Sequence, residues 1–197
     1  MGTTAWVIAA LLVVLLVWAV AVYNRLRGLR NRVENAWAQI DVQLKRRYEL
    51  IPNLVEVARG YLQHESSTLQ AVAQARSQAV QASESLRHAA RTSPELAALS
   101  AAEQQLGSSL GRLMVVAEAY PELKADAQMQ SLSEEIASTE NRIGFARQAY
   151  NDQLLEFNDK ASQFPDVLWA RLFGFGHMPM LQATVSEHER TAPQVRF

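Results

Sequence analysis

The 197-residue sequence contains no cysteine. Disulfide bonds, thiolate metal sites and cysteine nucleophiles are therefore excluded, and a reducing compartment is permitted. Glycine and proline are scarce, with 8 and 6 residues, and they stand at the edges of segments more than inside them. Because both residues interrupt regular structure, this placement is typical of long helices. The formal net charge is only −1, so the composition indicates no general affinity for nucleic acid.

A segment without any charged residue opens the chain. Residues 5–23 read AWVIAALLVVLLVWAVAVY, and a helix needs about 20 apolar residues to cross the hydrocarbon core of a bilayer. Basic residues beside a span stay on the cytoplasmic side. We therefore predict that residues 1–23 form a transmembrane anchor with the amino terminus outside. The basic residues that follow, and that could also attract anionic lipid headgroups, are Arg25, Arg27, Arg30 and Arg32.

Two other interpretations of this segment were weighed. Ala19-Val20-Ala21 resembles the cleavage site of a secretory signal, but a signal has a basic n-region and an apolar core of about 7–15 residues. Here nothing basic precedes the apolar core, and the core is longer. A buried helix of a soluble protein would need the remaining residues to surround it on all sides. Both interpretations are less favoured than a membrane anchor.

The next segment carries an apolar stripe with the spacing of a helix. The stripe keeps its phase across Pro52, which favours one continuous helix with a kink at Pro52 over two separate helices. Steps of three and four residues keep such a stripe on one helical face. Its members are Val33, Trp37, Ile40, Leu44, Tyr48, Ile51, Val55, Ala58 and Leu62.

Three further helices are indicated by their start and stop signals. Ser67 with Gln70 resembles a capping box, and Ser93-Pro94-Glu95 is a strong helix start. Tyr120-Pro121 closes the third helix, and the fourth runs from near Asp126 to Pro165 with apolar residues through Phe164. Short connections favour antiparallel neighbours. We therefore predict an all-α fold, in which residues 24–164 form an elongated, coiled-coil-like antiparallel four-helix bundle in the cytoplasm.

This topology returns the fourth helix toward the membrane. Residues 165–175, PDVLWARLFGF, place apolar side chains on one helical face, and we predict a short amphipathic segment on the cytoplasmic leaflet. These side chains are Leu168, Trp169, Leu172 and Phe173. The alternative is that the aromatic residues cap the open end of the bundle. Residues 176–197 are predicted to form a mobile tail.

No convincing active site is present. The metalloprotease pattern HExxH and the Glu-x-x-His pattern of di-iron bundles do not occur, so we expect no enzyme, cofactor, metal or small-molecule substrate. Lys45, Arg46 and Arg47 form a compact basic patch. The patch is interpreted as a solvated face, or as a contact point for an acidic partner together with Tyr120 and Pro121.

Three separated stretches resemble the LemA family of bacterial membrane proteins. They are residues 23–65 (YNRLRGLRNRVENAWAQIDVQLKRRYELIPNLVEVARGYLQHE), residues 117–125 (AEAYPELKA) and residues 140–158 (ENRIGFARQAYNDQLLEFN), followed by FP and LFGF between residues 164 and 175. The resemblance implies an amino-terminal span and an antiparallel helical bundle that faces the cytoplasm. It brings no catalytic residue. This chain continues for longer after LFGF than members of the family often do.

These features lead to two hypotheses of function. The first is a membrane-anchored, self-associating scaffold that organises or remodels the inner membrane, with the bilayer and copies of itself as partners. The second is a monomeric adaptor that presents its bundle to another membrane protein, such as a protease or a signalling kinase.

Overall fold

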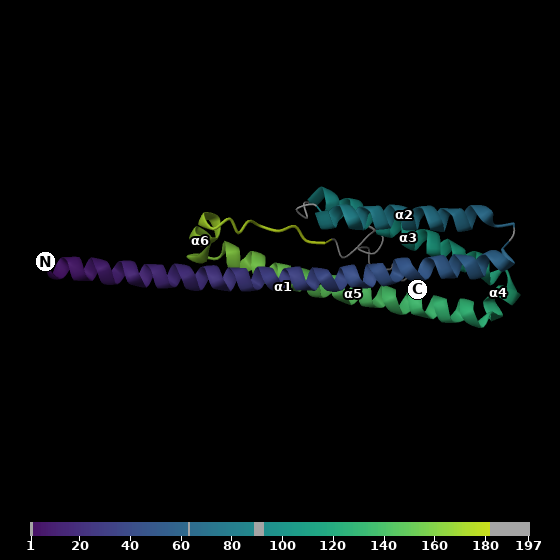
Figure 1. The fold of residues 1–197 in the computed structure, drawn as a ribbon, viewed down its shortest axis with the longest axis horizontal. Coiled ribbons are helices and arrows are strands. Elements are labelled where there is room, and N and C mark those ends of the chain that lie inside the picture. The colour runs from purple at the N-terminus through teal and green to yellow at the C-terminus, as the bar shows by residue number, and fades with distance from the viewer. Residues whose placement is uncertain (1, 63, 89–92, 182–197) are drawn as a thin grey trace, which may run out of the picture. The chain divides into compact units, whose positions relative to one another are not determined.

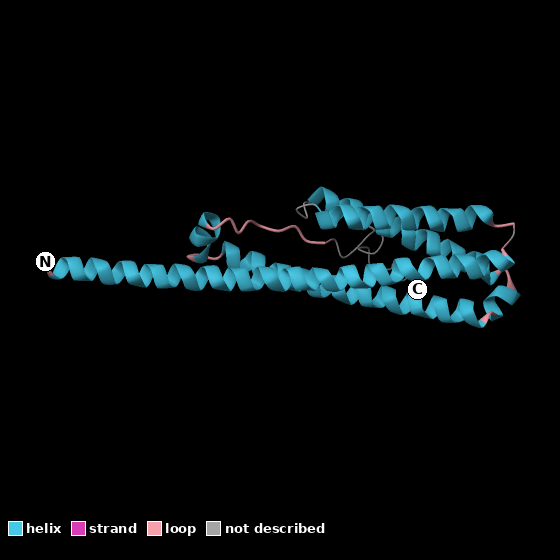
Figure 2. Ribbon diagram, viewed as in Figure 1, coloured by secondary structure: helices cyan, strands magenta, loops and turns pink. Residues whose placement is uncertain are grey.

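The computed structural model describes residues 2–62, 64–88 and 93–181. Every regular element in this part of the chain is a helix, as Figure 2 shows, so the predicted all-α class is confirmed. The helices are α1 (Thr3–Tyr61), α2 (Ser66–His88), α3 (Ser93–Glu118), α4 (Pro121–Ala125), α5 (Ala127–Ser162) and α6 (Asp166–Leu172).

Helix α1 joins the apolar amino-terminal segment to the stripe that follows it in one uninterrupted helix (Figure 1). Pro52 lies inside this helix, as predicted. A proline removes one backbone hydrogen bond, and the kink expected at Pro52 stays a prediction. Every member of the predicted stripe is buried, from Val33 to Leu62. The helix ends at Tyr61, directly after Gly60.

The chain divides into two compact units, which are described separately. The first, unit 1, comprises Met1–Ala38 and Ala149–Met180. Its core combines one face of α1 with one face of α5, and the rings of Trp37 and Tyr150 meet edge to face with centroids 5.5 Å apart. The buried side chains at helical spacing are Val22, Leu26, Leu29, Val33 and Trp37 on α1, and Tyr150, Leu154, Phe157 and Ala161 on α5.

The second, unit 2, comprises Gln39–Gln148 and Leu181–Phe197. Helices α2 and α3 pack against each other here. Many buried positions on α2 are alanines, such as Ala75 and Ala79, and small side chains allow helix backbones to approach closely. Leucines supply most of the core of α3, namely Leu96, Leu99, Leu106, Leu110 and Leu113.

A short helix that the sequence did not predict lies between α3 and α5. Pro121 stands at the first position of α4, where its missing N–H costs nothing, and Glu122 follows in the first turn. The Asp126 carboxylate then caps α5 by accepting a hydrogen bond from the Met129 N–H at 2.9 Å. This hydrogen bond, with one from Tyr61, lowers the pKa of Asp126.

The prediction for Phe164 at the end of α5 is wrong. Phe164 was assigned to the apolar stripe of the fourth helix, but α5 ends at Ser162 and the Phe164 side chain is 81% exposed. The mobility of the tail from Gly176 stays a prediction. The Met178 N–H donates to the side-chain oxygen of Asn158 at 3.0 Å, and the side-chain amide of Asn158 donates to the Met178 carbonyl at 2.9 Å. Residues 182–197 of the predicted tail lie outside the described residues.

Candidate membrane interface and buried charge cluster

The amino-terminal part of α1 presents apolar side chains on all sides. Leu11, Leu12 and Val14 are each more than 60% exposed, although they are the kind of residue that normally fills a core. This helix is long and apolar enough to cross a membrane. An exposed apolar surface of this extent requires cover from lipid or from protein.

An aromatic cluster lies where this apolar surface ends. The rings of Trp18 and Trp169 of α6 meet edge to face with their centroids 5.8 Å apart. The ring centroids of Tyr23 and Phe173 are 5.2 Å apart. The rings of Trp169 and Phe173 stack with their centroids 5.9 Å apart, and the ring centroids of Phe175 and Tyr23 are 5.7 Å apart. Tryptophan and tyrosine prefer the boundary between hydrocarbon and water. The cluster therefore fixes α6 beside the end of the apolar segment.

The four predicted apolar residues of α6 have two different environments. Trp169 and Phe173 contact Trp18 and Tyr23 of α1, whereas Leu168 and Leu172 are 59% and 70% exposed. The exposed Phe164 side chain precedes them. The segment therefore combines a face that packs on α1 with apolar side chains that the described residues leave uncovered.

The four arginines after the apolar segment also differ. Arg30 pairs with Glu34 on the same helix at 3.5 Å, and Arg32 pairs with Glu156 of α5 at 3.6 Å. Arg25 and Arg27 are exposed, and no carboxylate of a described residue pairs with either of them. The four arginines are therefore not equivalent. Arg30 and Arg32 are paired with carboxylates, whereas Arg25 and Arg27 have no carboxylate partner among the described residues.

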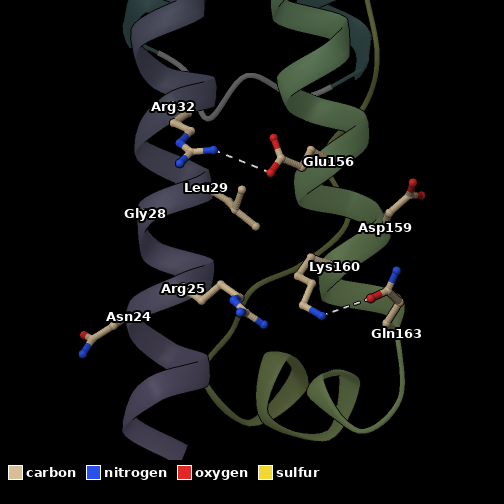
Figure 3. Close-up of a pocket in the computed structure, with 9 residues that line it drawn as sticks. All are labelled: Asn24, Arg25, Gly28, Leu29, Arg32, Glu156, Asp159, Lys160 and Gln163. Atoms are coloured by element: carbon tan, nitrogen blue, oxygen red, sulfur yellow. Dashed lines mark hydrogen bonds and ion pairs between the residues drawn. The ribbon is translucent and has the colours of Figure 1, made fainter.

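A cleft of about 750 Å³ opens between α1 and α5 just after the apolar segment (Figure 3). Its basic side chains are Arg25, Arg32 and Lys160, and its acidic ones are Glu156 and Asp159. Asn24, Gly28, Leu29 and Gln163 complete the lining. The amine of Lys160 donates to the Gln163 side chain at 3.1 Å and lies 3.2 Å from the Asp166 carboxylate.

In the basic patch of unit 2, Arg47 is not solvated as the sequence suggested. Arg47 is buried and forms ion pairs with Glu103 of α3 and Glu140 of α5. Arg46 is half-exposed and pairs with Glu135, and Lys45 is exposed. A guanidinium has five donors in a rigid fork, which suits it to bridging two carboxylates. The prediction of a solvated or partner-binding Arg47 is therefore wrong.

Tyr48 belongs to the same buried charge cluster as Arg47 and Glu103. Its hydroxyl donates to the Glu103 carboxylate, and its backbone carbonyl accepts a hydrogen bond from Arg76 of α2 at 2.6 Å. Burial, followed by the negative charge of Glu103, raises the pKa of Tyr48 well above its usual value. The cluster thus links α1 with α2, α3 and α5 within unit 2.

Glu103 was not among the predicted site residues. The sequence does indicate a core position for Glu103, because it stands between Leu99 and Leu106 at the spacing of the apolar stripe of α3. A carboxylate at a core position needs a buried cation, and Arg47 meets that need. Tyr120, the other suggested contact point, is half-buried directly before α4. Within the described part of the chain, no three His, Asp or Glu residues stand close enough together to hold a metal ion.

A model of the LemA family matches residues 36–197. A curated protein from Metamycoplasma hominis, Protein LemA, is 30% identical over 168 residues, which is 85% of this chain and 71% of that protein.

Proposed function

The chain belongs to the LemA family, and on that premise we propose that it is a membrane-anchored helical scaffold that associates with copies of itself. Its task is to organise or remodel the cytoplasmic membrane. It works without catalysis, with its amino terminus outside and its helical domain in the cytoplasm.

The exposed apolar surface of α1 is the observation that carries this proposal. Large apolar side chains from Trp6 to Val17 are exposed and have little cover among the described residues. Arg25 and Arg27 follow without a carboxylate partner in the described part of the chain, and such basic residues favour the cytoplasmic side. Since α1 continues without a break into the buried stripe, an anchored span would hold the helical domain at the membrane.

We propose that the cytoplasmic domain is an elongated antiparallel four-helix bundle. In unit 1, residue numbers increase along α1 while those of the contacted residues decrease. The pairs are Tyr23 with Phe173, which lies beyond the end of α5, Arg32 with Glu156, and Trp37 with Tyr150. This order supports an antiparallel pair. In unit 2, the buried charge cluster joins four helical segments.

Self-association is supported by apolar side chains on the outside of unit 2. Phe145 of α5 and Val115 of α3 are 73% and 69% exposed, and Val42 of α1 is 55% exposed. Aromatic side chains are enriched in interfaces between proteins and among the residues that contribute most to binding. Phe145 is therefore the first candidate for a contact between copies.

Mass photometry of the full-length protein in detergent tests the proposal. We expect species of several copies, and we expect Phe145→Asp to shift the distribution toward the monomer. Gln148→Asp is the matched control, because it adds the same charge to an exposed position of α5 with no apolar area to lose. A wild-type protein that is entirely monomeric would contradict the scaffold.

That outcome would favour the adaptor instead. An adaptor should recover one dominant partner at a fixed ratio when the tagged protein is purified from membranes. Burial of Arg47 weakens the adaptor hypothesis, since it leaves Lys45 and Arg46 as the accessible part of the basic contact point suggested for it.

A further inference from the structure

The cleft between α1 and α5 in unit 1 contains a cation that has no partner among the described residues. Of its basic side chains, Arg32 pairs with Glu156 at 3.6 Å. Lys160 pairs with Asp166 at 3.2 Å and donates to Gln163, which leaves one of the three donors of its ammonium for a further acceptor. Arg25 lines the same cleft, and no described carboxylate pairs with it. Such a guanidinium retains its full capacity for a bidentate contact with a phosphate.

The side chains point in a way that suits an anion. Figure 3 shows Arg25 and Lys160 reaching into the space between the two helices, whereas the carboxylate of Asp159 points away from α1. Gly28 contributes no side chain to the wall, and a Cβ added there would meet no atom within 4 Å. The volume of about 750 Å³ is within the range of small-molecule sites.

The depth of the cleft identifies the source of the anion. If the apolar segment spans the bilayer up to Tyr23, then Arg25 lies only about 3 Å beyond it along the helix axis. Headgroups occupy roughly 5–8 Å on each side of the hydrocarbon core. Arg25 is then at the level of the lipid phosphates, and Arg32, about 14 Å beyond Tyr23, is past them.

We propose that this cleft binds the phosphate of an anionic phospholipid of the cytoplasmic leaflet, with Arg25 and Lys160 as the phosphate ligands. The proposal rests on the membrane anchoring proposed above. It differs from a general attraction between a basic segment and an anionic membrane, because it requires particular side chains and an open cleft.

Native mass spectrometry of the full-length protein released from nanodiscs tests it. The nanodiscs contain phosphatidylcholine with a minor fraction of phosphatidylglycerol, and the measured quantity is the ratio of the two lipids retained per chain. We expect the wild type to retain phosphatidylglycerol preferentially. Arg25→Gln and Lys160→Gln should each reduce this preference by about tenfold or more, the change that corresponds to the loss of one charge-assisted hydrogen bond to the phosphate.

Two further variants separate the cleft from general attraction. Arg27→Gln removes the same charge two residues away, outside the cleft lining, and should leave most of the preference intact. Gly28→Leu fills the cleft without a change of charge, into space that is open at the Cβ, and should remove the preference. Leucine is also the better helix former. An equal loss in Arg27→Gln, or no loss in Gly28→Leu, would overturn the proposal.

A soluble anion is the remaining source of a phosphate. Millimolar inorganic phosphate should not displace phosphatidylglycerol from the wild type, and displacement would overturn the assignment to a lipid. The oligomer distribution of the same samples keeps the two proposals apart. Loss of lipid preference with normal insertion and assembly concerns the cleft alone, whereas failure to insert into the nanodisc would count against the anchor itself.

Discussion

Replacement of Arg47 by methionine tests the buried charge cluster most sharply. The Arg47 and Glu103 side chains are only 2% and 3% exposed. Removal of the cation leaves the Glu103 carboxylate buried with the Tyr48 hydroxyl as its hydrogen-bond donor among the described residues. Breaking a buried pair in this way costs about 3–5 kcal/mol. For a domain of this size, the melting temperature should fall by about 6–20 °C.

Thermal unfolding of the detergent-solubilised protein, followed by circular dichroism, measures this change. Arg46→Met is the matched control, because Arg46 and Glu135 are 53% and 36% exposed, and exposed pairs contribute about 0–1 kcal/mol. The double variant Arg47→Met with Glu103→Met should be more stable than Arg47→Met alone, since it removes the unpaired charge. The reasoning would be refuted if Arg46→Met and Arg47→Met lowered the melting temperature equally. It would also be refuted if the double variant lost as much stability as Arg47→Met and Glu103→Met lose separately when added together.

Three other predictions use different parts of the chain. A dye attached to Leu172→Cys in nanodiscs should report an apolar environment and be quenched by lipid-borne quenchers, whereas the same dye on Asn53→Cys should not. Equal quenching at the two positions would argue against contact of α6 with lipid. Both labels are specific because the sequence contains no native cysteine. A membrane-impermeant maleimide on intact cells should label Gly2→Cys and should reach Asn53→Cys only after lysis; the reverse pattern would invert the proposed topology. The raised pKa of Tyr48 means that its contribution to stability is complete below about pH 10, the ordinary tyrosine pKa, and is lost as the pH rises above it. Tyr48→Phe should remove this loss of stability at alkaline pH. It should also lower the free energy of unfolding at neutral pH by about 1–3 kcal/mol, because Glu103 loses a hydrogen-bond donor. If the stability of Tyr48→Phe falls at alkaline pH as that of the wild type does, Tyr48 does not titrate with unfolding.

The helices were largely predictable because their signals are local. The start of α3 at Ser93 and the passage of α1 through Pro52 were both read from neighbouring residues and from the phase of an apolar stripe. Helix α4 was missed because Pro121 was interpreted as a stop, although the same residue is also favoured at the first position of a new helix.

The contacts of single charged and aromatic side chains were less predictable. Arg47 stands next to Arg46 in the sequence, yet one is buried and the other half-exposed, because neighbouring residues on a helix point about 100° apart. Which of them faces the core depends on Glu103, which is 56 residues away. The division of α6 into Trp169, which packs on α1, and Leu172, which stays exposed, likewise depends on where α6 meets α1.

Extraction of isolated cell membranes with alkaline carbonate tests the central claim most directly, because it removes peripheral proteins and leaves those that span the bilayer. The full-length chain should remain in the membrane pellet, held by the uncovered apolar surface of α1. Recovery of the intact chain in the carbonate supernatant, or in the aqueous fraction before extraction, would contradict the anchored scaffold.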